Sequence, residues 1–337
     1  MHDPAISSAA HHPYAQLSPD VVLDALAGVG LMGDGRLAAL NSYENRVYQV
    51  WLEDGSRVVC KFYRPGRWSD AAIAEEHAFS LALADAEIPV VAPLAVRGAT
   101  LHHHAGFSFS VSPWRGGRQP ELDDFEVLEW IGRFLARIHT VGAAQPFAQR
   151  PAISVQAFGQ EPHDWLLQHG DISPAQRTAW SRVCLQALEQ VGRAFSAHGC
   201  QSIRLHGDCH PGNVLWVPAD EPGGGPHFVD LDDARMGPAA QDLWMLLSGD
   251  RAQRSLQLST LVEGYEQFRP FDRRELALIE PLRTLRLIHY SAWLARRWHD
   301  PIFPIHFPWF GTEAYWGEQV QLLQGQLAAM DEEPLRI

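Results

Sequence analysis

Cysteine is scarce in this 337-residue chain, and long apolar runs are missing from it. The four cysteines show no C-x-x-C spacing, which argues against a zinc site and a disulfide framework and fits a reducing compartment. No stretch of about 18 uninterrupted apolar residues exists, so the sequence excludes a membrane-spanning helix. Residues 1–14 also lack the basic-then-apolar pattern of a secretory signal. We therefore expect a cytoplasmic protein with no membrane partner.

Positive charge is scarce as well, because 27 Lys and Arg stand against 40 Asp and Glu, for a formal net charge of −13. Nonspecific nucleic-acid binding requires positive charge that displaces counterions from phosphates, so we expect no nucleic-acid partner. The apolar share of 46% and charged share of 20% are those of an ordinary globular protein. A small anionic ligand held by a local basic site stays compatible with this charge.

The spacing of apolar residues changes along the chain and predicts two lobes. After a loose leader over 1–17, the first part alternates apolar and polar residues as strands do, and the part beyond 113 spaces apolar residues as helices do. We predict an α+β fold with segregated elements: a small antiparallel-sheet lobe over 1–113 and a larger helical lobe over 114–337. The expected elements are a helix from Ser18, strands 46–52, 57–63 and 107–112, helices 69–86, 124–141 and 174–198, and short strands 214–217 and 227–231.

The strongest motif is His206-Gly-Asp-Cys-His-Pro-Gly-Asn213, followed after a hairpin-sized gap by Phe228-Val-Asp-Leu-Asp-Asp233. Phosphoryl transfer from ATP needs a carboxylate for the attacking hydroxyl, oxygen ligands for Mg²⁺ and cations on the triphosphate. Asp208 would be the base, and Asn213 and Asp230 would be the metal ligands. The alternative is a polar turn that satisfies its own backbone. The acidic strand end that follows at the right distance favours the phosphotransfer site.

Two features of the N-terminal lobe fit the same chemistry. Lys61 lies on the returning strand of a hairpin, where a phosphate-binding lysine belongs, although an edge-strand lysine in solvent is the alternative. Glu75 and Glu76 on the following helix are both available to pair with it. The segment 41–46 takes the place of a glycine-rich loop but has no glycine, so backbone N–H groups and the Ser42 hydroxyl would cap phosphates there. A simple polar turn is the other interpretation of that segment.

Residues around the motif are given supporting roles. His206 and His210 flank the base and are expected to support the loop by hydrogen bonds. Asp232 is a candidate for a second metal ion. Asp242 opens an apolar helix, where an N-cap role would be purely structural.

Three further features are assigned no chemistry. Adjacent histidines 102–104 point in different directions, so we expect a solvated hairpin turn and no metal cluster. The aromatic stretch 301–310 is predicted to be core, with a substrate platform as the alternative. The sequence leaves open whether four arginines face the cleft or decorate helices: Arg283, Arg286, Arg296 and Arg297.

The motif resembles the catalytic loop of aminoglycoside phosphotransferases, choline kinases and related kinase-like enzymes. Longer strings are similar to those of a narrower group, the bacterial stress response kinase A family, and the similarity extends over roughly residues 15–330. The strings are Leu40-Asn-Ser-Tyr-Glu-Asn-Arg-Val-Tyr48, Val59-Cys-Lys-Phe-Tyr-Arg-Pro65, Arg204-Leu-His-Gly-Asp-Cys-His210 and Phe228-Val-Asp-Leu-Asp-Asp-Ala-Arg235.

This resemblance implies a two-lobed, protein-kinase-like fold and a monomeric serine/threonine protein kinase of the stress response. Its cofactors would be ATP and Mg²⁺, and its partners would be proteins bearing Ser or Thr. By the same likeness Asp208 is the proton acceptor, Asn213 and Asp230 hold Mg²⁺, and Ser42 contacts ATP. The likeness also favours Glu76 over Glu75 as the partner of Lys61 and gives Asp242 the task of bracing the catalytic loop.

Two other functions are weighed against this one. A small-molecule kinase acting on an aminoglycoside, choline or a sugar needs the same catalytic parts, so the motifs do not discriminate against it. A nucleotide-binding pseudokinase scaffold would have lost the base, the metal ligand or the lysine, and all three are present.

Overall fold

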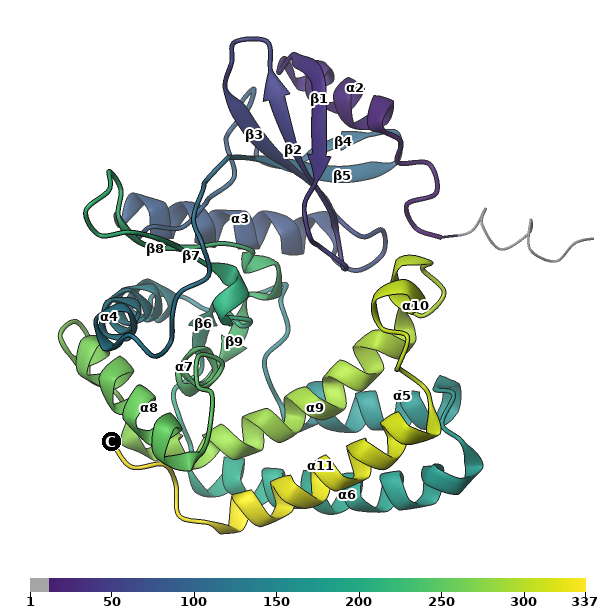
Figure 1. Cartoon of the computed structure of the whole chain (residues 1–337), viewed down its shortest axis with the longest axis vertical. Helices are drawn as coiled ribbons and strands as arrows, with labels where there is room; N and C mark the ends of the chain where they lie inside the picture. The colour runs from purple at the N-terminus through teal and green to yellow at the C-terminus, as the bar shows by residue number, and fades with distance from the viewer. Residues whose placement is uncertain (1–11) are drawn as a thin grey trace, which may run out of the picture.

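The structure, a computed structural model, describes residues 12–337. Figure 1 shows a strand-rich lobe standing above a larger lobe made mostly of helices. The expected α+β class with segregated elements is confirmed. Residues 1–11 of the expected loose leader lie outside the described residues. Residues 12–17 correct that expectation, because Tyr14 and Leu17 are buried in the core of the sheet lobe.

The N-terminal sheet is antiparallel throughout and has the strand order β1-β2-β3-β5-β4. Its strands are β1 (Gly33–Ala39), β2 (Arg46–Leu52), β3 (Arg57–Phe62), β4 (His102–His104) and β5 (Phe107–Pro113). Side chains alternate along a strand, so Cys60 and Phe62 of β3 enter the core that the sheet shares with α2 (Pro19–Val29), whereas Lys61 faces a cavity on the opposite side. The alternation thereby turns Lys61 toward the helical lobe.

Two capped helices complete the N-terminal lobe. The Ser18 side chain accepts a hydrogen bond from Val21 N at the start of α2, as expected of a Ser-Pro helix start. Ser69 caps α3 (Asp70–Asp85) in the same way. The buried Phe79 and Leu83 of α3 belong to the hydrophobic core of the helical lobe. This helix therefore packs the two lobes together.

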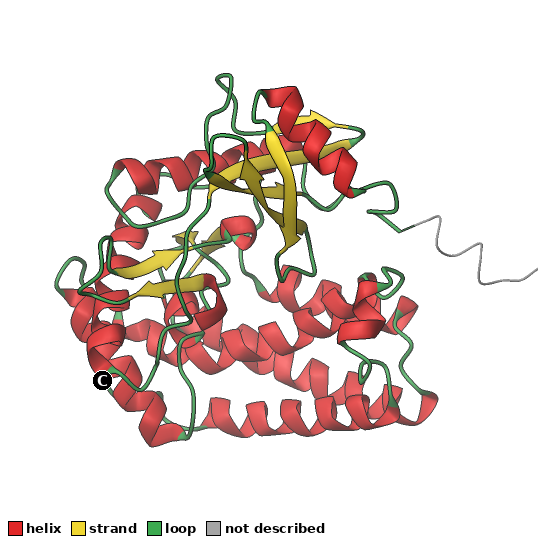
Figure 2. Cartoon of the chain, turned by 45° about the horizontal axis from the view of Figure 1, so that its top comes forward, coloured by secondary structure: helices red, strands yellow, loops and turns green. Residues whose placement is uncertain are grey.

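The C-terminal lobe is built from long helices, drawn in red in Figure 2. They are α4 (Phe125–Gly142), α5 (Glu161–His169), α6 (Pro174–Ala197), α8 (Arg251–Glu266), α9 (Ile279–Arg296) and α11 (Glu313–Asp331), with the short α7 (Ala240–Trp244) and α10 (Ile302–His306). The helix α9 contacts α5, α6 and α11. Within residues 12–337, every helix falls short of the length or the apolar character that a bilayer-spanning segment needs.

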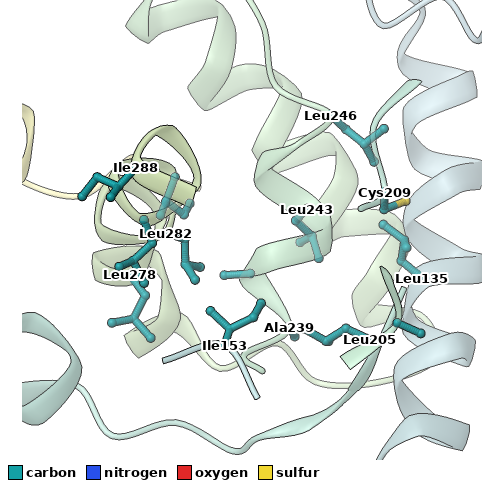
Figure 3. Packing of buried hydrophobic residues seen from close by; sticks show 14 of the residues in the cluster. Leu135, Ile153, Leu205, Cys209, Ala239, Leu243, Leu246, Leu278, Leu282 and Ile288 are labelled. Atoms are coloured by element: carbon teal, nitrogen blue, oxygen red, sulfur yellow. The ribbon is translucent and has the colours of Figure 1, made fainter. Parts of the chain in front are cut away.

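Two short strand pairs frame the motif loops. The strand β6 (Ile203–Leu205) pairs with β9 (Arg235–Gly237), and β7 (Val214–Val217) pairs with β8 (Gly225–Phe228). Figure 3 shows Cys209 beside Leu135 and Leu246 in the buried core of this lobe. The residue that follows Asp208 is thus anchored in the hydrophobic core.

The structure corrects two expected elements. The strand expected over 227–231 ends at Phe228, so Asp230 lies in a turn with a left-handed φ of 59° and not at a strand end. The three histidines form the strand β4, where a solvated hairpin turn was expected. The turn itself falls on Ala105 and Gly106, both with positive φ.

Candidate active site

Two cavities meet between the lobes. One, the sheet-side cavity, has a volume of about 470 Å³ and lies against β2 and β3, with Lys61 and Glu76 in its wall. The other, the helix-side cavity, has a volume of about 460 Å³ and is lined by Asp208 and by side chains of α9. Five residues line both cavities: Asn41, Ser42, Gly212, Asn213 and Asp230. A molecule in one cavity can therefore meet a molecule in the other at the motif residues.

The catalytic loop that carries Asp208 is held by a buried carboxylate. Asp242 on α7 accepts hydrogen bonds from His206 N at 2.9 Å and Gly207 N at 2.8 Å, and its Oδ2 lies 3.0 Å from His139 Nε2. Burial would raise the pKa of Asp242, but these bonds and the nearby imidazoles hold that pKa below its ordinary value. A charged acceptor makes strong hydrogen bonds in a buried site. Asp242 thus fixes the backbone immediately before Asp208.

Glycine is required at position 207 for two reasons. Its φ is +83°, and a Cβ there would lie 2.2 Å from the Asp233 carbonyl oxygen. This close approach brings the loop of Asp208 against the segment that carries Asp230. His206 strengthens the same contact, because its Nε2 donates to the Val229 carbonyl at 2.9 Å.

Asn213 is oriented by the loop itself. Its Nδ2 donates to the Asp208 carbonyl oxygen at 3.0 Å, which leaves the Oδ1 atom of this amide for a ligand. His210 accepts from Gly212 N through Nδ1 at 3.0 Å, and its Nε2 lies 3.6 Å from Asp208 Oδ2. Burial lowers the pKa of His210, although the Asp208 carboxylate opposes that effect. Both histidines of the motif, His206 and His210, therefore make hydrogen bonds that support the loop.

Lys61 and Asp230 lie in direct contact across the lobes. Lys61 Nζ donates to Asp230 Oδ1 at 2.6 Å and lies 3.9 Å from Asp232 Oδ1. Burial alone would lower the pKa of Lys61, but the two carboxylates raise that pKa well above its ordinary value, so the ammonium stays charged. The Asp230 side chain is 45% exposed. It is therefore accessible to a ligand from the cavities.

The expected ion pair between Lys61 and Glu76 is not formed among the described residues. Glu76 is buried, accepts from Ser80 Oγ at 3.1 Å and leaves Oε2 without a hydrogen-bond partner. Burial raises the pKa of Glu76, and the nearby Lys61 opposes that rise. Glu75 instead accepts from the backbone of Ala148 and Gln149. Of the two candidates only Glu76 lines the sheet-side cavity.

Asp232 is engaged by an arginine that the sequence did not single out. Arg67 pairs with the Asp232 and Asp233 carboxylates, the latter at 2.7 Å. Burial would raise the pKa of Asp232, but Arg67 and Lys61 hold that pKa below its ordinary value. The carboxylate that we considered for a second metal ion is thus buried and already paired.

The structure places the four arginines for which the sequence left two locations open, and only Arg286 contacts the proposed base. Arg286 lies on the helix-side cavity, with one guanidinium nitrogen 2.7 Å from Asp208 Oδ1. Arg297 pairs with Glu44. Arg283 pairs with Glu280, and Arg296 lies over the Trp165 ring.

The aromatic stretch 301–310 divides between core and cavity. Phe303 and Phe310 are buried, as expected. Phe307 lines the helix-side cavity, so this part of the stretch is not core alone. Ile305 and Trp309 are exposed.

The residues at the shared wall fit a magnesium ion. No group of three or more His, Cys, Asp and Glu side chains suited to a metal occurs within residues 12–337. Mg²⁺ does not need such a group, because it binds one or two protein carboxylates and completes its shell with water and phosphate oxygens. The Asp230 carboxylate and the Asn213 amide oxygen are hard ligands of that kind, and both line the two cavities.

Sequence reasoning missed Glu44 and Arg67, and it left open whether Arg286 faces the cleft. Each contacts the site through a partner that is distant in the chain: Arg67 and Asp232 are 165 positions apart, and Glu44 and Trp293 are 249 apart. No local pattern signals such pairs.

Comparisons with known proteins identify relatives over nearly the whole chain. A model of the "Phosphotransferase enzyme family" matches residues 36–279. Stress response kinase A of Escherichia coli (strain K12) is 47% identical over 327 residues, which cover 96% of this chain and 97% of the relative. Serine/threonine protein kinase RdoA of Salmonella typhimurium (strain LT2) is 46% identical over 324 residues, with the same two shares.

A solved structure gives the fold. The complex of amicoumacin kinase hAmiN with AMP-PNP, Ca²⁺ and Ami superimposes with a TM-score of 0.68 at 19% identity, covering 99% of this chain and 98% of that one. A likeness at this identity concerns the fold alone. The two-lobed, kinase-like fold expected from the sequence is thereby confirmed.

Proposed function

Since this chain belongs to the phosphotransferase enzyme family and, within it, to the stress response kinase A group, we propose that it is a cytoplasmic, Mg-ATP-dependent serine/threonine protein kinase of the bacterial stress response. The name of the relative that is 46% identical over 96% of the chain supports the protein acceptor. The observation that carries the proposal is the wall of five residues common to the two cavities. ATP would occupy the sheet-side cavity, and the acceptor would occupy the helix-side cavity.

ATP would be held by apolar contacts to its adenine and by ionic contacts to its phosphates. Aliphatic side chains from both lobes line the sheet-side cavity and would sandwich the adenine: Val47, Val59, Val91, Pro93, Leu215 and Val229. Lys61, charged and beside Asp230, would bind phosphate oxygens, and Ser42 would contact them from the loop between β1 and β2. Glu76, buried in the same wall, would support the lysine.

The transfer itself would use Asp208. As the acceptor oxygen forms its bond to the γ-phosphorus, the bond from that phosphorus to the bridging oxygen of ADP breaks, and Asp208 takes the hydroxyl proton. Asn213 and Asp230 would hold Mg²⁺, which supplies positive charge to the phosphates when bound. His206, His210 and Asp242 would keep the loop in place through the hydrogen bonds described above.

An assay with labelled ATP tests both the reaction and the acceptor. The purified chain is incubated with γ-labelled ATP, Mg²⁺ and either casein or a mixture of choline and an aminoglycoside, and label is counted separately in protein and in small molecules. We expect label on Ser or Thr of the protein. Transfer to the small alcohols alone would overturn the protein-kinase assignment.

The variant Asp208→Asn tests the base. We expect it to lower the single-turnover rate by about 100-fold or more, the usual contribution of a general base. Asp24→Asn, on the exposed face of α2, is the matched control and should behave as wild type. Equal rates for Asp208→Asn and wild type would remove Asp208 from its proposed role.

A further inference from the structure

The loop 41–45 between β1 and β2, here called the phosphate loop, contains no glycine. Glycine usually gives such loops the left-handed conformations that aim successive N–H groups at a phosphate. No residue of the phosphate loop, which is fully described, has a positive φ. Ser42 nevertheless lines both cavities. The shape of the loop must therefore depend on contacts made by its side chains.

Glu44 makes the most extensive of these contacts. Its Oε1 forms an ion pair with Arg64 Nε at 2.9 Å, and its Oε2 lies 3.8 Å from an Arg67 guanidinium nitrogen. On α9, Trp293 Nε1 donates to Glu44 Oε2 at 2.6 Å, and Arg297 Nε lies 2.5 Å from the same oxygen. The Glu44 side chain is 12% exposed, so solvent screens these contacts little. One carboxylate thus joins the phosphate loop to the helical lobe.

A second carboxylate, this time from the helical lobe, closes the same network. Asp300 pairs with Arg64 at 2.7 Å and with Arg46 at 3.0 Å. Burial would raise the pKa of Asp300, but the two guanidinium groups hold that pKa below its ordinary value. Arg64 N also donates to Asn45 Oδ1 at 3.1 Å. The Arg64 side chain, which Asp300 and Glu44 share, also donates from Nε to the Glu44 carbonyl oxygen at 3.0 Å, so this arginine binds the backbone of the phosphate loop as well.

The surface that receives the loop is the wall of the helix-side cavity. The Tyr43 ring lies 5.0 Å from the ring of Phe307, centroid to centroid, in an edge-on arrangement. Tyr43, Trp293 and Phe307 all line the helix-side cavity. A molecule in that cavity would touch the side chains on which the phosphate loop rests.

We infer that Glu44 is a positioning residue that fixes the phosphate loop to the acceptor wall on α9, so that Mg-ATP affinity depends on this contact. Glu44 would act through Ser42, two residues earlier, and would not touch the phosphates itself. The inference rests on the proposed function, which assigns ATP to the sheet-side cavity. The affinity for the nucleotide would then depend on contacts at the acceptor side, between a carboxylate of one lobe and a tryptophan and an arginine of the other.

The variant Glu44→Gln tests the inference without an acceptor. Glutamine keeps the size and an acceptor oxygen but removes the charge that faces three arginines. We expect the dissociation constant for Mg-ATP, measured by calorimetric titration well below the unfolding temperature, to rise about tenfold, the effect of losing one charge-assisted hydrogen bond. Glu53→Gln, at the exposed turn beyond the other end of β2, is the matched control and should bind as wild type.

Variants of Arg297 examine the same contact from the helical lobe. Arg297→Gln should weaken Mg-ATP binding as Glu44→Gln does, and Arg297→Lys, which keeps the charge, should recover much of the loss. The double variant Glu44→Gln/Arg297→Gln should bind about as weakly as Glu44→Gln alone, because Glu44→Gln already removes the charge that Arg297 pairs with. A purely structural role would lower the unfolding temperature of the free protein and leave the dissociation constant unchanged.

The Trp293 indole offers a second readout that needs no folded Glu44 variant. In a spectrum of ¹⁵N-labelled indole groups, Trp293→Phe identifies the resonance by its loss. We expect Mg-ATP to shift this resonance in the wild-type chain, because the indole N–H reports on the Glu44 carboxylate.

The outcomes separate the inference from the proposed function. If the wild-type chain does not bind Mg-ATP, the proposed function is wrong. If it binds while Glu44→Gln and Arg297→Gln bind equally well, the positioning role is overturned. If neither variant folds, the Trp293 resonance decides, and a resonance unmoved by Mg-ATP overturns the inference.

Discussion

Glu275 is a buried carboxyl group of the short 3-10 helix Arg273–Leu278, and it contacts the start of α7, the helix that carries Asp242. It is 3% exposed, and its Oε2 accepts a hydrogen bond from Ala240 N at 2.8 Å. Burial raises the pKa of Glu275 from an ordinary 4.5 to about 7, an effect that Asp272 adds to and the Ala240 bond opposes. This carboxyl therefore holds its proton at a pH where the unfolded chain has released it.

The raised pKa predicts a pH-dependent stability with a definite sign. Below pH 4.5 the group is protonated in both states, and between pH 4.5 and 7 only the folded state keeps the proton, so the stabilisation is lost as pH rises. The loss amounts to about 3 kcal/mol of unfolding free energy. We expect Glu275→Gln to gain stability relative to wild type over this interval, as measured by urea unfolding at several pH values. The exposed Glu263→Gln should run parallel to wild type, and a parallel curve for Glu275→Gln would contradict the prediction.

For single residues, the sequence was informative where the chemically important side chains lie close together in the chain. Asp208 and Asn213 are five positions apart on one loop, and the structure places both at the helix-side cavity with Asp230. Their catalytic roles stay predictions. Glu44 and Arg67 could not be found, and Arg286 could not be assigned to the cleft, because their partners are set by how the lobes pack and not by spacing. The expected Lys61–Glu76 pair was wrong for a related reason, since Asp230 of the other lobe is the nearer carboxylate.

Among the elements, α4 and α8 approach more closely than ordinary helices can. A Cβ on Gly132 of α4 would lie 2.1 Å from the Leu261 carbonyl oxygen, and one on Gly264 of α8 would lie 2.1 Å from the Glu129 carbonyl oxygen. Each glycine thus receives the backbone of the partner helix. These glycines are required by close approach, since backbone atoms cannot give way as a flexible side chain can.

We predict opposite effects for two Gly→Ala changes in helices. Gly264→Ala should force α4 and α8 apart and lower the unfolding free energy by about 1–3 kcal/mol, the usual cost of overpacking. Gly192→Ala, on α6, meets nothing within 4 Å and should raise stability by roughly 0.5–1 kcal/mol through helix propensity. Denaturant unfolding of both variants checks the pair. Equal stability of the two would contradict the close approach of α4 and α8.

Element prediction succeeded where periodicity is strong. Strands over β2, β3 and β5 and helices over α3, α4 and α6 were expected within a residue or two, because their apolar spacing is regular. β1 escaped because its sequence, Gly-Asp-Gly-Arg-Leu-Ala-Ala, has no β-branched residue and owes its extended form to pairing with β2. The start of β8 was not predicted because the strand begins with Gly225-Pro226, two residues that are unusual in strands. Its end was predicted too late, because the backbone turns at Asp230, which has a left-handed φ.

The whole molecule holds together through two hydrophobic cores and an ionic network between them. One core lies under α2 and the other fills the helical lobe and includes one face of α3. Between them, arginines after β3 reach carboxylates in both lobes. A buried network of this kind specifies one arrangement of charges more than it adds stability. It would hold the lobes at the separation that the two cavities need.

We propose above all that Lys61, Asn213 and Asp230 converge on one magnesium-bridged triphosphate beside Asp208. A crystal structure of this chain with a non-hydrolysable ATP analogue and Mg²⁺ would show whether they do. We predict the γ-phosphate at the wall shared by the two cavities, with Asn213 and Asp230 as the protein ligands of the metal and Lys61 on a phosphate oxygen. An analogue bound elsewhere, or a metal held by other residues, would contradict the claim.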